Sequence, residues 1–273
     1  APDILRGAAA RRVLADGQGP RPAAPDRGAR RAAVLAELAG QGFLVVEERS
    51  PALAVVGPKG IYELACHRDG LVDIQDLASQ QIGLAVDARP GQTVWDCCAG
   101  AGGKSLQLAA AMQGKGAVHA TDLYENKLKD LRRRARRAGW ANLRAGLWDG
   151  DRLPDFGPEV LGRGGFDRVL VDAPCSGSGT WRRHPDGRLR FAPDQLPDLA
   201  AVQQSLLVTA AEAVRPGGLV VYATCSWFRA ENEDVVAAFL AARPEFALRA
   251  QQLHGNPAED ADTTFTAVLE RMG

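Results

Sequence analysis

Two cysteines in this sequence each follow an apolar, β-branched run of strand length, and a serine follows each of them. The first run is V-L-V-D-A-P-C-S, from Val169 to Ser176, and the second is V-V-Y-A-T-C-S, from Val220 to Ser226. Short apolar runs bounded by turn signals are typical of buried strands. Residues just past the carboxyl ends of parallel strands line the ligand crevice of an open α/β sheet, so Cys175 and Cys225 are predicted to face one another across a single site.

A thiol in such a position is suited to covalent catalysis, provided that its surroundings favour the thiolate. Asp172 ends the first run and is placed to act at the same site. Lys104 has two interpretations: it orients Asp172, or it is a solvated helix lysine. The alternative for both cysteines is a small buried hydrophobic residue, the commoner fate of free cysteines. Because two predicted strands both end at Cys-Ser, a role in covalent catalysis is favoured over that of a buried hydrophobic residue.

A glycine-rich segment, D-C-C-A-G-A-G-G-K-S from Asp96 to Ser105, lies between a predicted strand and a predicted helix. A P-loop would need glycine in place of Cys98, and a dinucleotide fingerprint starting at Gly100 would need glycine in place of Ser105. We therefore expect a turn whose backbone amides a ligand approaches at a helix N-terminus, with a plain tight turn as the alternative. Asp122 ends the next predicted strand and is placed to accept the hydroxyls of a ribose.

The elements around these segments alternate between strand and helix. Strands are predicted over 43–47, 52–56, 93–98, 117–122, 142–147, 166–172, a run ending at Ala223, 246–248 and 264–269. Helices are predicted over 29–38, 72–86, 103–112, 126–138, 196–214 and 231–242. This alternation predicts an α/β fold with a doubly wound parallel sheet. The domains are expected to be an arm over 1–30 without a clear first strand, a small α+β appendage over 31–68, and a main domain over 69–273.

The composition limits the class of protein. The 273 residues carry no net formal charge and include five cysteines, two of them adjacent at Cys97 and Cys98. This pattern does not suggest a disulfide framework and favours reduced thiols in the cytoplasm. No run of eighteen apolar residues occurs, so no membrane span is expected, and no apolar core is long enough for a signal peptide. Cys66-His67 lacks a zinc-site spacing, so no metal is expected.

Any interaction with nucleic acid must therefore depend on local charge. Residues 127–144 carry eight basic residues against one acidic residue, Asp130. This run either attracts RNA or is solvated surface, and solvation is favoured for at least half of it. The loop T-W-R-R-H-P-D offers an aromatic ring for base stacking and two guanidinium groups for phosphates. The RNA-binding residues predicted from it are Trp181, Arg182, Arg183 and His184.

Several of these motifs together resemble one family. They are D-C-C-A-G-A-G-G-K-S, V-L-V-D-A-P-C-S-G-S-G, R-R-H-P-D, and Y-A-T-C-S followed by E-N-E at Glu231 to Glu233. This combination resembles the Sun-type RNA cytosine-5 methyltransferases of the NOL/NOP/Sun superfamily, which include the bacterial RsmB-like enzymes. The similarity covers roughly residues 68–245.

The resemblance implies a Rossmann-like methyltransferase sheet, S-adenosyl-L-methionine as cofactor, and RNA, ribosomal RNA foremost, as substrate of a cytoplasmic monomer. It makes Cys225 the nucleophile, assigns Cys175 to breakdown of the covalent adduct, and places Asp172 at the target base. Lys104 is predicted to assist the thiolate. The residues predicted to bind the cofactor are Cys98, Ala99, Gly100, Ala101, Gly102, Gly103, Lys104, Asp122, Asp149 and Asp172, with Asp151 as the alternative to Asp149.

Two other functions remain open. The family usually has Ala-Pro where this chain has Gly100-Ala101, which predicts a looser loop. That difference leaves room for a non-catalytic RNA-binding scaffold on a methyltransferase fold. A DNA cytosine-5 methyltransferase is the other alternative, because those enzymes use a Pro-Cys nucleophile, which would here be Cys175.

Overall fold

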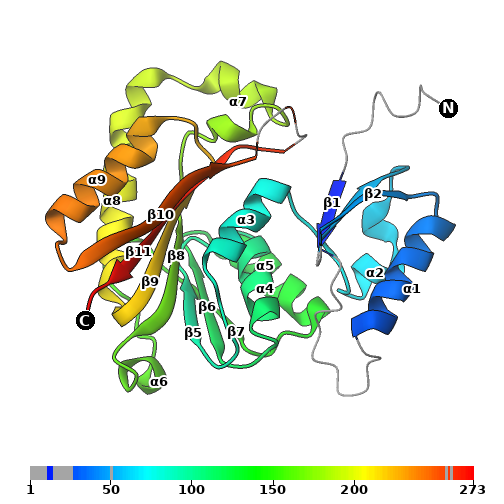
Figure 1. Cartoon of the computed structure of the whole chain (residues 1–273), viewed down its shortest axis with the longest axis horizontal. Helices are drawn as coiled ribbons and strands as arrows, with labels where there is room; N and C mark the ends of the chain where they lie inside the picture. Colours follow the sequence, from blue (N-terminus) through cyan, green and yellow to red (C-terminus); the bar gives the residue numbers. More distant parts are fainter. Residues whose placement is uncertain (1–10, 15–26, 50–51, 256–257, 259–260) are drawn as a thin grey trace.

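The computed structural model describes residues 11–14, 27–49, 52–255, 258 and 261–273. Within these residues the chain forms a four-stranded sheet and a seven-stranded sheet. The smaller sheet comes first along the chain and lies beside the helices that cover one face of the larger sheet (Figure 1).

The smaller sheet is antiparallel throughout, with the order β2-β3-β1-β4. Its strands are β1 (Arg11–Leu14), β2 (Leu44–Arg49), β3 (Ala52–Val56) and β4 (Asp73–Ile74). Its helical elements are α1 (Arg27–Gly40), η2 (Ile61–Glu63) and α2 (Ala65–Arg68). Val34 and Leu38 of α1 pack against Leu53 and Val55 of β3, and this buried cluster is the core of the small α+β region.

The interpretation of residues 1–30 as an arm without a first strand is wrong for residues 11–14. They form β1, which pairs with β3 on one side and with β4 on the other. The run R-R-V-L is too short to show strand alternation, so its pairing partners decide its conformation. Residues 1–10 and 15–26 lie outside the described part of the chain.

The larger sheet has the strand order β10-β11-β9-β8-β5-β6-β7. Its strands are β5 (Thr93–Asp96), β6 (Ala117–Asp122), β7 (Leu143–Leu147), β8 (Phe166–Asp172), β9 (Val214–Thr224), β10 (Phe246–His254) and β11 (Thr264–Arg271). The strands from β5 to β9 pair in parallel, whereas β11 pairs antiparallel with both β9 and β10. The expected α/β class with a largely parallel, Rossmann-like sheet is confirmed.

Helices cover both faces of this sheet (Figure 1). The helices of this part of the chain are α3 (Leu77–Ala85), α4 (Gly103–Ala111), α5 (Glu125–Ala138), α6 (Pro158–Leu161), α7 (Pro185–Arg190), α8 (Leu196–Glu212) and α9 (Glu233–Ala242), with short turns η3 (Ser178–Thr180), η4 (Pro193–Gln195) and η5 (Arg229–Glu231). Those on the faces are α3, α4 and α5 on one side and α8 and α9 on the other. Within β9, Val220 and Tyr222 join the core under α8 and α9, whereas Val221 and Ala223 join the core under α3 and α4. This alternation explains why the strand reads as a continuous apolar run: both of its faces are buried.

The helix predicted over 72–86 begins later than expected. Asp73–Ile74 is strand β4, and the helix starts at Leu77. Asp76 is the N-cap, and its carboxylate accepts a hydrogen bond of 2.8 Å from the backbone amide of Ala78. An aspartate at this position satisfies an amide that the first helical turn leaves unpaired. Among the described residues, no helix is both long and apolar enough to cross a membrane.

Candidate active site

The structure brings the two predicted thiols together at the carboxyl edge of the sheet. Strands β8 and β9 are parallel neighbours, with Asp172 opposite Ala223. The segments that follow the two strands therefore leave the sheet side by side at its carboxyl edge. The Cys175 and Cys225 Sγ atoms lie 3.4 Å apart, within hydrogen-bonding distance. Both side chains are half-buried, which leaves room for a reacting group to approach.

The contact between the thiols makes them unequal. The hydrogen bond with Cys175 lowers the pKa of Cys225, against the opposing effects of burial and of the Asp172 carboxylate, and the Lys104 charge lowers it further. The same hydrogen bond, together with burial, raises the pKa of Cys175 well above that of an ordinary thiol. The directions of these two pKa shifts agree with the assignment of Cys225 as the nucleophile, which stays a prediction.

Lys104 and Asp172 form a half-buried ion pair beside the thiols. The Lys104 Nζ atom lies 2.7 Å from Asp172 Oδ2. Burial alone would lower the pKa of Lys104, but the Asp172 carboxylate outweighs burial and raises it. Lys104 is thus a cation that orients Asp172, which is the first of its two sequence interpretations.

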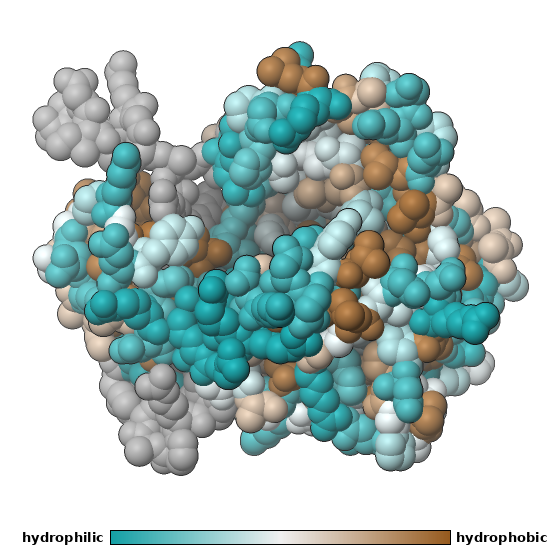
Figure 2. Space-filling view, turned by 180° about the vertical axis from the view of Figure 1, so that it is seen from behind, coloured by the Kyte–Doolittle hydropathy of each residue, from teal (hydrophilic) through white to brown (hydrophobic). Residues whose placement is uncertain are grey.

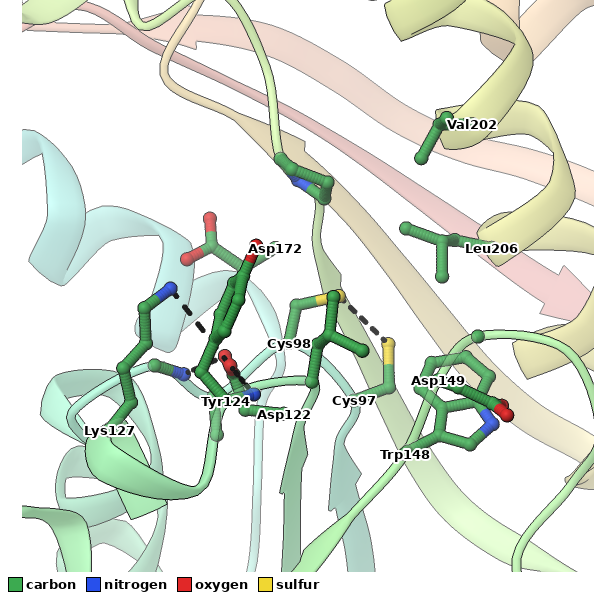
Figure 3. A pocket seen from close by; sticks show the side chains of 15 residues that line it. Cys97, Cys98, Asp122, Tyr124, Lys127, Trp148, Asp149, Asp172, Val202 and Leu206 are labelled. Carbon is green, nitrogen blue, oxygen red and sulfur yellow. Dashed lines mark hydrogen bonds and ion pairs between the residues drawn. The ribbon is translucent and has the colours of Figure 1, made fainter. Parts of the chain in front are cut away.

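A pocket of about 440 Å³ opens next to this pair, at the carboxyl ends of β5, β6 and β8. Asp122 lies between the glycine-rich turn and Tyr124, with Asp172 above it, whereas Val202 and Leu206 approach from α8 (Figure 3). Of the residues predicted to bind the cofactor, those that line this pocket are Cys98, Ala99, Gly100, Asp122, Asp149 and Asp172. The others, Ala101, Gly102, Gly103 and Lys104, are not among its lining residues and belong to the turn and the first residues of α4.

Asp122 is tied to the glycine-rich turn by its own carboxylate. Its Oδ2 atom accepts a hydrogen bond of 2.9 Å from the Gly100 amide, and its Oδ1 atom accepts one of 2.9 Å from the Tyr124 amide. Lys127 Nζ lies 3.9 Å from the same carboxylate. Asp122 therefore faces the pocket in a fixed orientation, where it is able to accept hydrogen bonds from the hydroxyls of a ligand.

The turn needs glycine at Gly102. This residue adopts a left-handed conformation with φ of 88°, and a Cβ atom there would lie 2.6 Å from Leu131 Cγ of α5. Such a conformation strains residues with side chains, and the contact excludes even a methyl group. Close packing of α5 against the turn thus determines which residue stands at this point.

Asp149 and Asp151, the two alternatives for one acid of the predicted cofactor site, differ in position. Asp149 lines the pocket and Asp151 is not among its lining residues. The Asp149 Oδ1 atom accepts a hydrogen bond of 3.0 Å from the Asp151 amide, which holds the W-D-G-D turn. The geometry favours Asp149 over Asp151, and its role at a ligand stays a prediction.

Sequence reasoning missed the walls of this pocket. Trp148 from the loop after β7, Tyr124 from the start of α5, and Val202 and Leu206 from α8 line it as well. Val202 and Leu206 belong to an apolar stripe along α8, and such a stripe does not distinguish a core-facing side from a pocket-facing side. The 48% exposure of Val202 shows that this part of the stripe faces outward from the core.

Asp96, the first residue of the glycine-rich segment, is a buried acid that sequence reasoning also left without a role. Its Oδ2 atom accepts a hydrogen bond of 2.6 Å from the Ser105 hydroxyl, and its Oδ1 atom has no partner among the residues that the structure describes. Burial raises the pKa of Asp96 to about 7, although the Ser105 hydrogen bond opposes the rise.

The predicted RNA-binding loop also has structural partners. The guanidinium of Arg183 forms hydrogen bonds with both carboxylate oxygens of Asp262, and Arg182 lies 3.7 Å from that carboxylate. His184 is exposed and precedes α7. These ion pairs anchor the loop to the segment before β11, and the contacts of Arg182, Arg183 and His184 with RNA stay predictions.

Trp181 belongs to a group of aromatic rings beside the thiols. Its ring centroid lies 6.1 Å from that of Trp227 and 5.5 Å from that of Phe191. Trp227 follows the T-C-S motif directly and is 50% exposed, whereas Trp181 is half-buried. Trp227 thus offers more ring surface to a base than Trp181.

Most of the basic run over 127–144 is neutralised by neighbouring acids. Its ion-paired members, with their partners, are Lys127 with Asp122, Arg132 with Glu125, Arg133 with Asp130, Arg134 and Arg137 with Asp73, and Arg144 with Glu159. This pairing agrees with the solvated-surface interpretation of at least half of the run. Hydrophilic residues cross the middle of one face of the molecule, which is hollowed below the lobe that carries α7 (Figure 2). In the described part of the chain, no cluster of metal-ligating side chains occurs.

Comparison with solved structures identifies the class of this fold. The crystal structure of PH0851 matches with a TM-score of 0.85 and 28% identity, covering 98% of this chain and 61% of that chain. The crystal structure of a methyltransferase homolog protein from Pyrococcus horikoshii matches with a TM-score of 0.74 and 23% identity, covering 99% of this chain and 89% of that chain. The fold is that of the Rossmann-like methyltransferase class.

Comparison of sequences narrows the class to a family. The family described as 16S rRNA methyltransferase RsmB/F matches residues 83–269. The ribosomal RNA small subunit methyltransferase B of Thermus thermophilus is 43% identical over 173 residues, which are 63% of this chain and 40% of that protein. The chain belongs to the RsmB/F family, which confirms the resemblance of its motifs, and it spans less than half the length of this relative.

Proposed function

We propose that this chain is the catalytic part of an S-adenosylmethionine-dependent RNA cytosine-C5 methyltransferase that acts through a covalent adduct between Cys225 and C6 of the base. The observation that carries the proposal is the pair of thiols, 3.4 Å apart at two strand ends, beside the Lys104–Asp172 ion pair and the carboxylate-lined pocket. Ribosomal RNA is the proposed substrate, because the family and the Thermus thermophilus relative are described as ribosomal RNA methyltransferases.

The pocket has the chemistry that S-adenosylmethionine requires. The donor presents ribose hydroxyls, amino groups and a sulfonium charge, and it supplies an electrophilic methyl group. Asp122, Asp149 and Asp172 line the pocket and offer acceptors and negative charge, whereas Leu206 and Trp148 offer apolar surface. Its volume of about 440 Å³ lies within the range usual for small-ligand sites. Of the described residues, Lys127 is the only cation that lines the pocket, which does not favour a phosphate-rich ligand.

The two thiols divide the reaction between them. The Cys225 thiolate forms a bond to C6, and the electron pair of the C5–C6 double bond makes C5 nucleophilic enough to take the methyl group. Asp172, oriented by Lys104, shares a proton with N3 of the ring and thereby stabilises the charge that develops there. Cys175 then carries the C5 proton away to solvent, the electron pair of the C5–H bond restores the C5–C6 double bond, and the C6–S bond breaks with its electron pair returning to the Cys225 sulfur.

A base within a duplex is blocked by stacking, so the target cytosine must be single-stranded or flipped out. Trp227 is the exposed ring nearest to the T-C-S motif in sequence, and we propose that it stacks a base next to the target. The small α+β region around β1 to β4 is proposed to contribute to RNA docking, and the catalytic unit is proposed to act as a monomer.

Methyl transfer from labelled donor to RNA and to DNA tests the proposal. We expect transfer to RNA by the unaltered chain, a loss of at least about 1,000-fold in Cys225→Ala, and an accumulated enzyme–RNA adduct on a denaturing gel for Cys175→Ser. Donor binding without any transfer would point to a scaffold. Transfer to DNA that survives Cys225→Ala but not Cys175→Ser would point to the DNA-type mechanism.

A further inference from the structure

Glu231 is a fully buried acid that lies between the two cysteine motifs and that the reaction above does not use. It belongs to the E-N-E segment and ends the short turn η5 before α9. Its side chain does not line the donor pocket. Burial of an acid is costly unless its oxygens are paired, so the partners of this carboxylate indicate what it does.

The Glu231 carboxylate accepts four hydrogen bonds, which is about the full capacity of its two oxygens. Oε1 accepts from the Ser176 amide at 2.8 Å and from Gln203 Nε2 at 3.0 Å. Oε2 accepts from the hydroxyls of Ser176 at 2.6 Å and Ser226 at 2.5 Å. The backbone carbonyl of Glu231 in turn accepts a hydrogen bond of 2.5 Å from the Tyr222 hydroxyl of β9.

These partners belong to both cysteine motifs. Ser176 directly follows Cys175, and Ser226 directly follows Cys225. Gln203 of α8 also donates to the Pro174 carbonyl at 2.9 Å, which holds the residue before Cys175. A single carboxylate therefore joins two loops that leave different strands, and three of its four hydrogen bonds come from the residues directly after the two cysteines.

We propose that Glu231 is a positioning residue, which through Ser176 and Ser226 holds the Cys175 and Cys225 thiols in the hydrogen-bonded arrangement that distinguishes the nucleophile from its partner. What this pair does to a substrate rests on the function proposed above, but the arrangement itself is a property of the chain alone. Breaking a paired buried acid destabilises a protein whatever its role, so loss of stability does not test the proposal.

The charge of Glu231 and its hydrogen bonds favour the same difference between the two thiols. After the hydrogen bond with Cys225 and burial, this carboxylate contributes to raising the pKa of Cys175. It thus helps to keep the proton on Cys175, which leaves Cys225 as the thiol that ionises. Besides Cys175, the groups that act on the pKa of Cys225 are Asp172, Lys104 and Asp262. The Glu231 carboxylate differs from these groups because it is hydrogen-bonded to Ser176 and Ser226.

The test is the rate of alkylation of each thiol by iodoacetamide between pH 6 and pH 10, followed by mass spectrometry on the whole chain without RNA or donor. The variants are Glu231→Ala, which removes all four bonds, and Ser176→Ala, which removes one hydroxyl and leaves the carboxylate in place. Asp234→Asn, an exposed acid in the first turn of α9, and Ser205→Ala, an exposed serine of α8, are the matched controls. Circular dichroism checks that each variant is folded.

We expect Cys225 of the unaltered chain to react at least about tenfold faster than Cys175 at pH 7.5, because the thiolate is the reactive form and the pKa of Cys225 is lowered whereas that of Cys175 is raised. In Glu231→Ala and Ser176→Ala this ratio falls at least fivefold, and the midpoint of Cys225 alkylation rises towards that of an ordinary thiol, about 8.5. Both controls keep the ratio of the unaltered chain.

A ratio within twofold of the unaltered chain in folded Ser176→Ala overturns the proposal, as does equal reactivity of the two thiols in the unaltered chain. If Glu231→Ala does not fold, Ser176→Ala decides. Failure of the proposed function is a different result: no methyl transfer by the unaltered chain, with the difference between the thiols intact.

Discussion

At the scale of single residues, side chains of the same type differ in pKa and in hydrogen bonding because their surroundings differ. Cys175 and Cys225 are the same side chain in nearly the same burial, yet the pKa of one rises and that of the other falls because they share one hydrogen bond. Asp96 and Asp122 both follow buried strands, but only Asp122 has hydrogen bonds to both oxygens. Partner geometry rather than residue type decides which group reacts, binds or stays protonated.

Asp96 predicts a pH dependence of stability. Its pKa is raised to about 7 in the folded chain, against about 3.9 in an unfolded chain, so the folded state holds this proton more tightly. The free energy of unfolding should therefore fall as pH rises from about 4 to about 7 and then level off. Relative to Asp96→Asn, the unaltered chain should lose on the order of 2 kcal/mol between pH 5 and pH 7.5.

Urea unfolding at several pH values measures this difference. Asp194→Asn, which changes an exposed acid, should follow the unaltered chain at every pH. Parallel curves for Asp96→Asn and the unaltered chain would show that Asp96 is ionised throughout this range.

At the scale of elements, the pocket proposed for the donor depends on turns that connect strands to helices. The glycine-rich turn is held by the Gly100 amide on Asp122 and by Arg134 Nη1, which donates to the Ala101 carbonyl at 2.7 Å. That the loop is looser at Gly100-Ala101 stays a prediction. In the structure, helix α5 contacts the turn through Arg134 and Leu131.

Gly102→Ala should destabilise the chain by about 1–3 kcal/mol, because the residue would keep a left-handed conformation and its methyl group would press on Leu131. Donor affinity should fall as well, since the turn must move. Thermal unfolding and calorimetry with S-adenosylmethionine measure the two effects. The control is Gly146→Ala in β7, where a Cβ atom meets nothing within 4 Å and where we expect a change below about 0.5 kcal/mol. Equal effects of the two substitutions would contradict this account.

At the scale of the whole molecule, one acid connects the two sheets. Asp73 of β4 pairs with Arg134 and Arg137 of α5, and the same Arg134 contacts the glycine-rich turn. Gly70 adds a close approach, because a Cβ atom there would lie 2.6 Å from the Ala138 backbone. The small sheet is thus attached to α5, the helix that also contacts the glycine-rich turn.

Asp73→Ala should lower the free energy of unfolding by about 2 kcal/mol, because it leaves two largely buried guanidinium groups without this partner. Proteolysis within residues 43–72 should become faster at the same time. Asp130→Ala removes an exposed pair with Arg133 and should cost below about 1 kcal/mol, without the change in proteolysis. An unchanged cleavage pattern in Asp73→Ala would show that other contacts hold the sheets together.

Local patterns in the sequence were sufficient for most of the fold. Strands β6 and β8 match their predicted bounds because their apolar runs are buried on both faces and end at acids. Strand β1 could not be predicted, since four residues carry too little pattern and their pairing with β3 and β4 decides their conformation. The helix predicted over 72–86 begins too early because no glycine or proline separates Val72 and Ile74 from the apolar residues of α3.

The sequence by itself determined the chemistry that is available: two Cys-Ser strand ends, an acid after each of three strands, and a glycine-rich turn. These features are local, so residue type and spacing are enough to read them. Only the tertiary structure decided how they combine: the 3.4 Å between the thiols, the four bonds of Glu231, and the pairing of Arg183 with Asp262. Those contacts join segments far apart in the chain, and their geometry depends on how the sheet and helices pack, which no local pattern encodes.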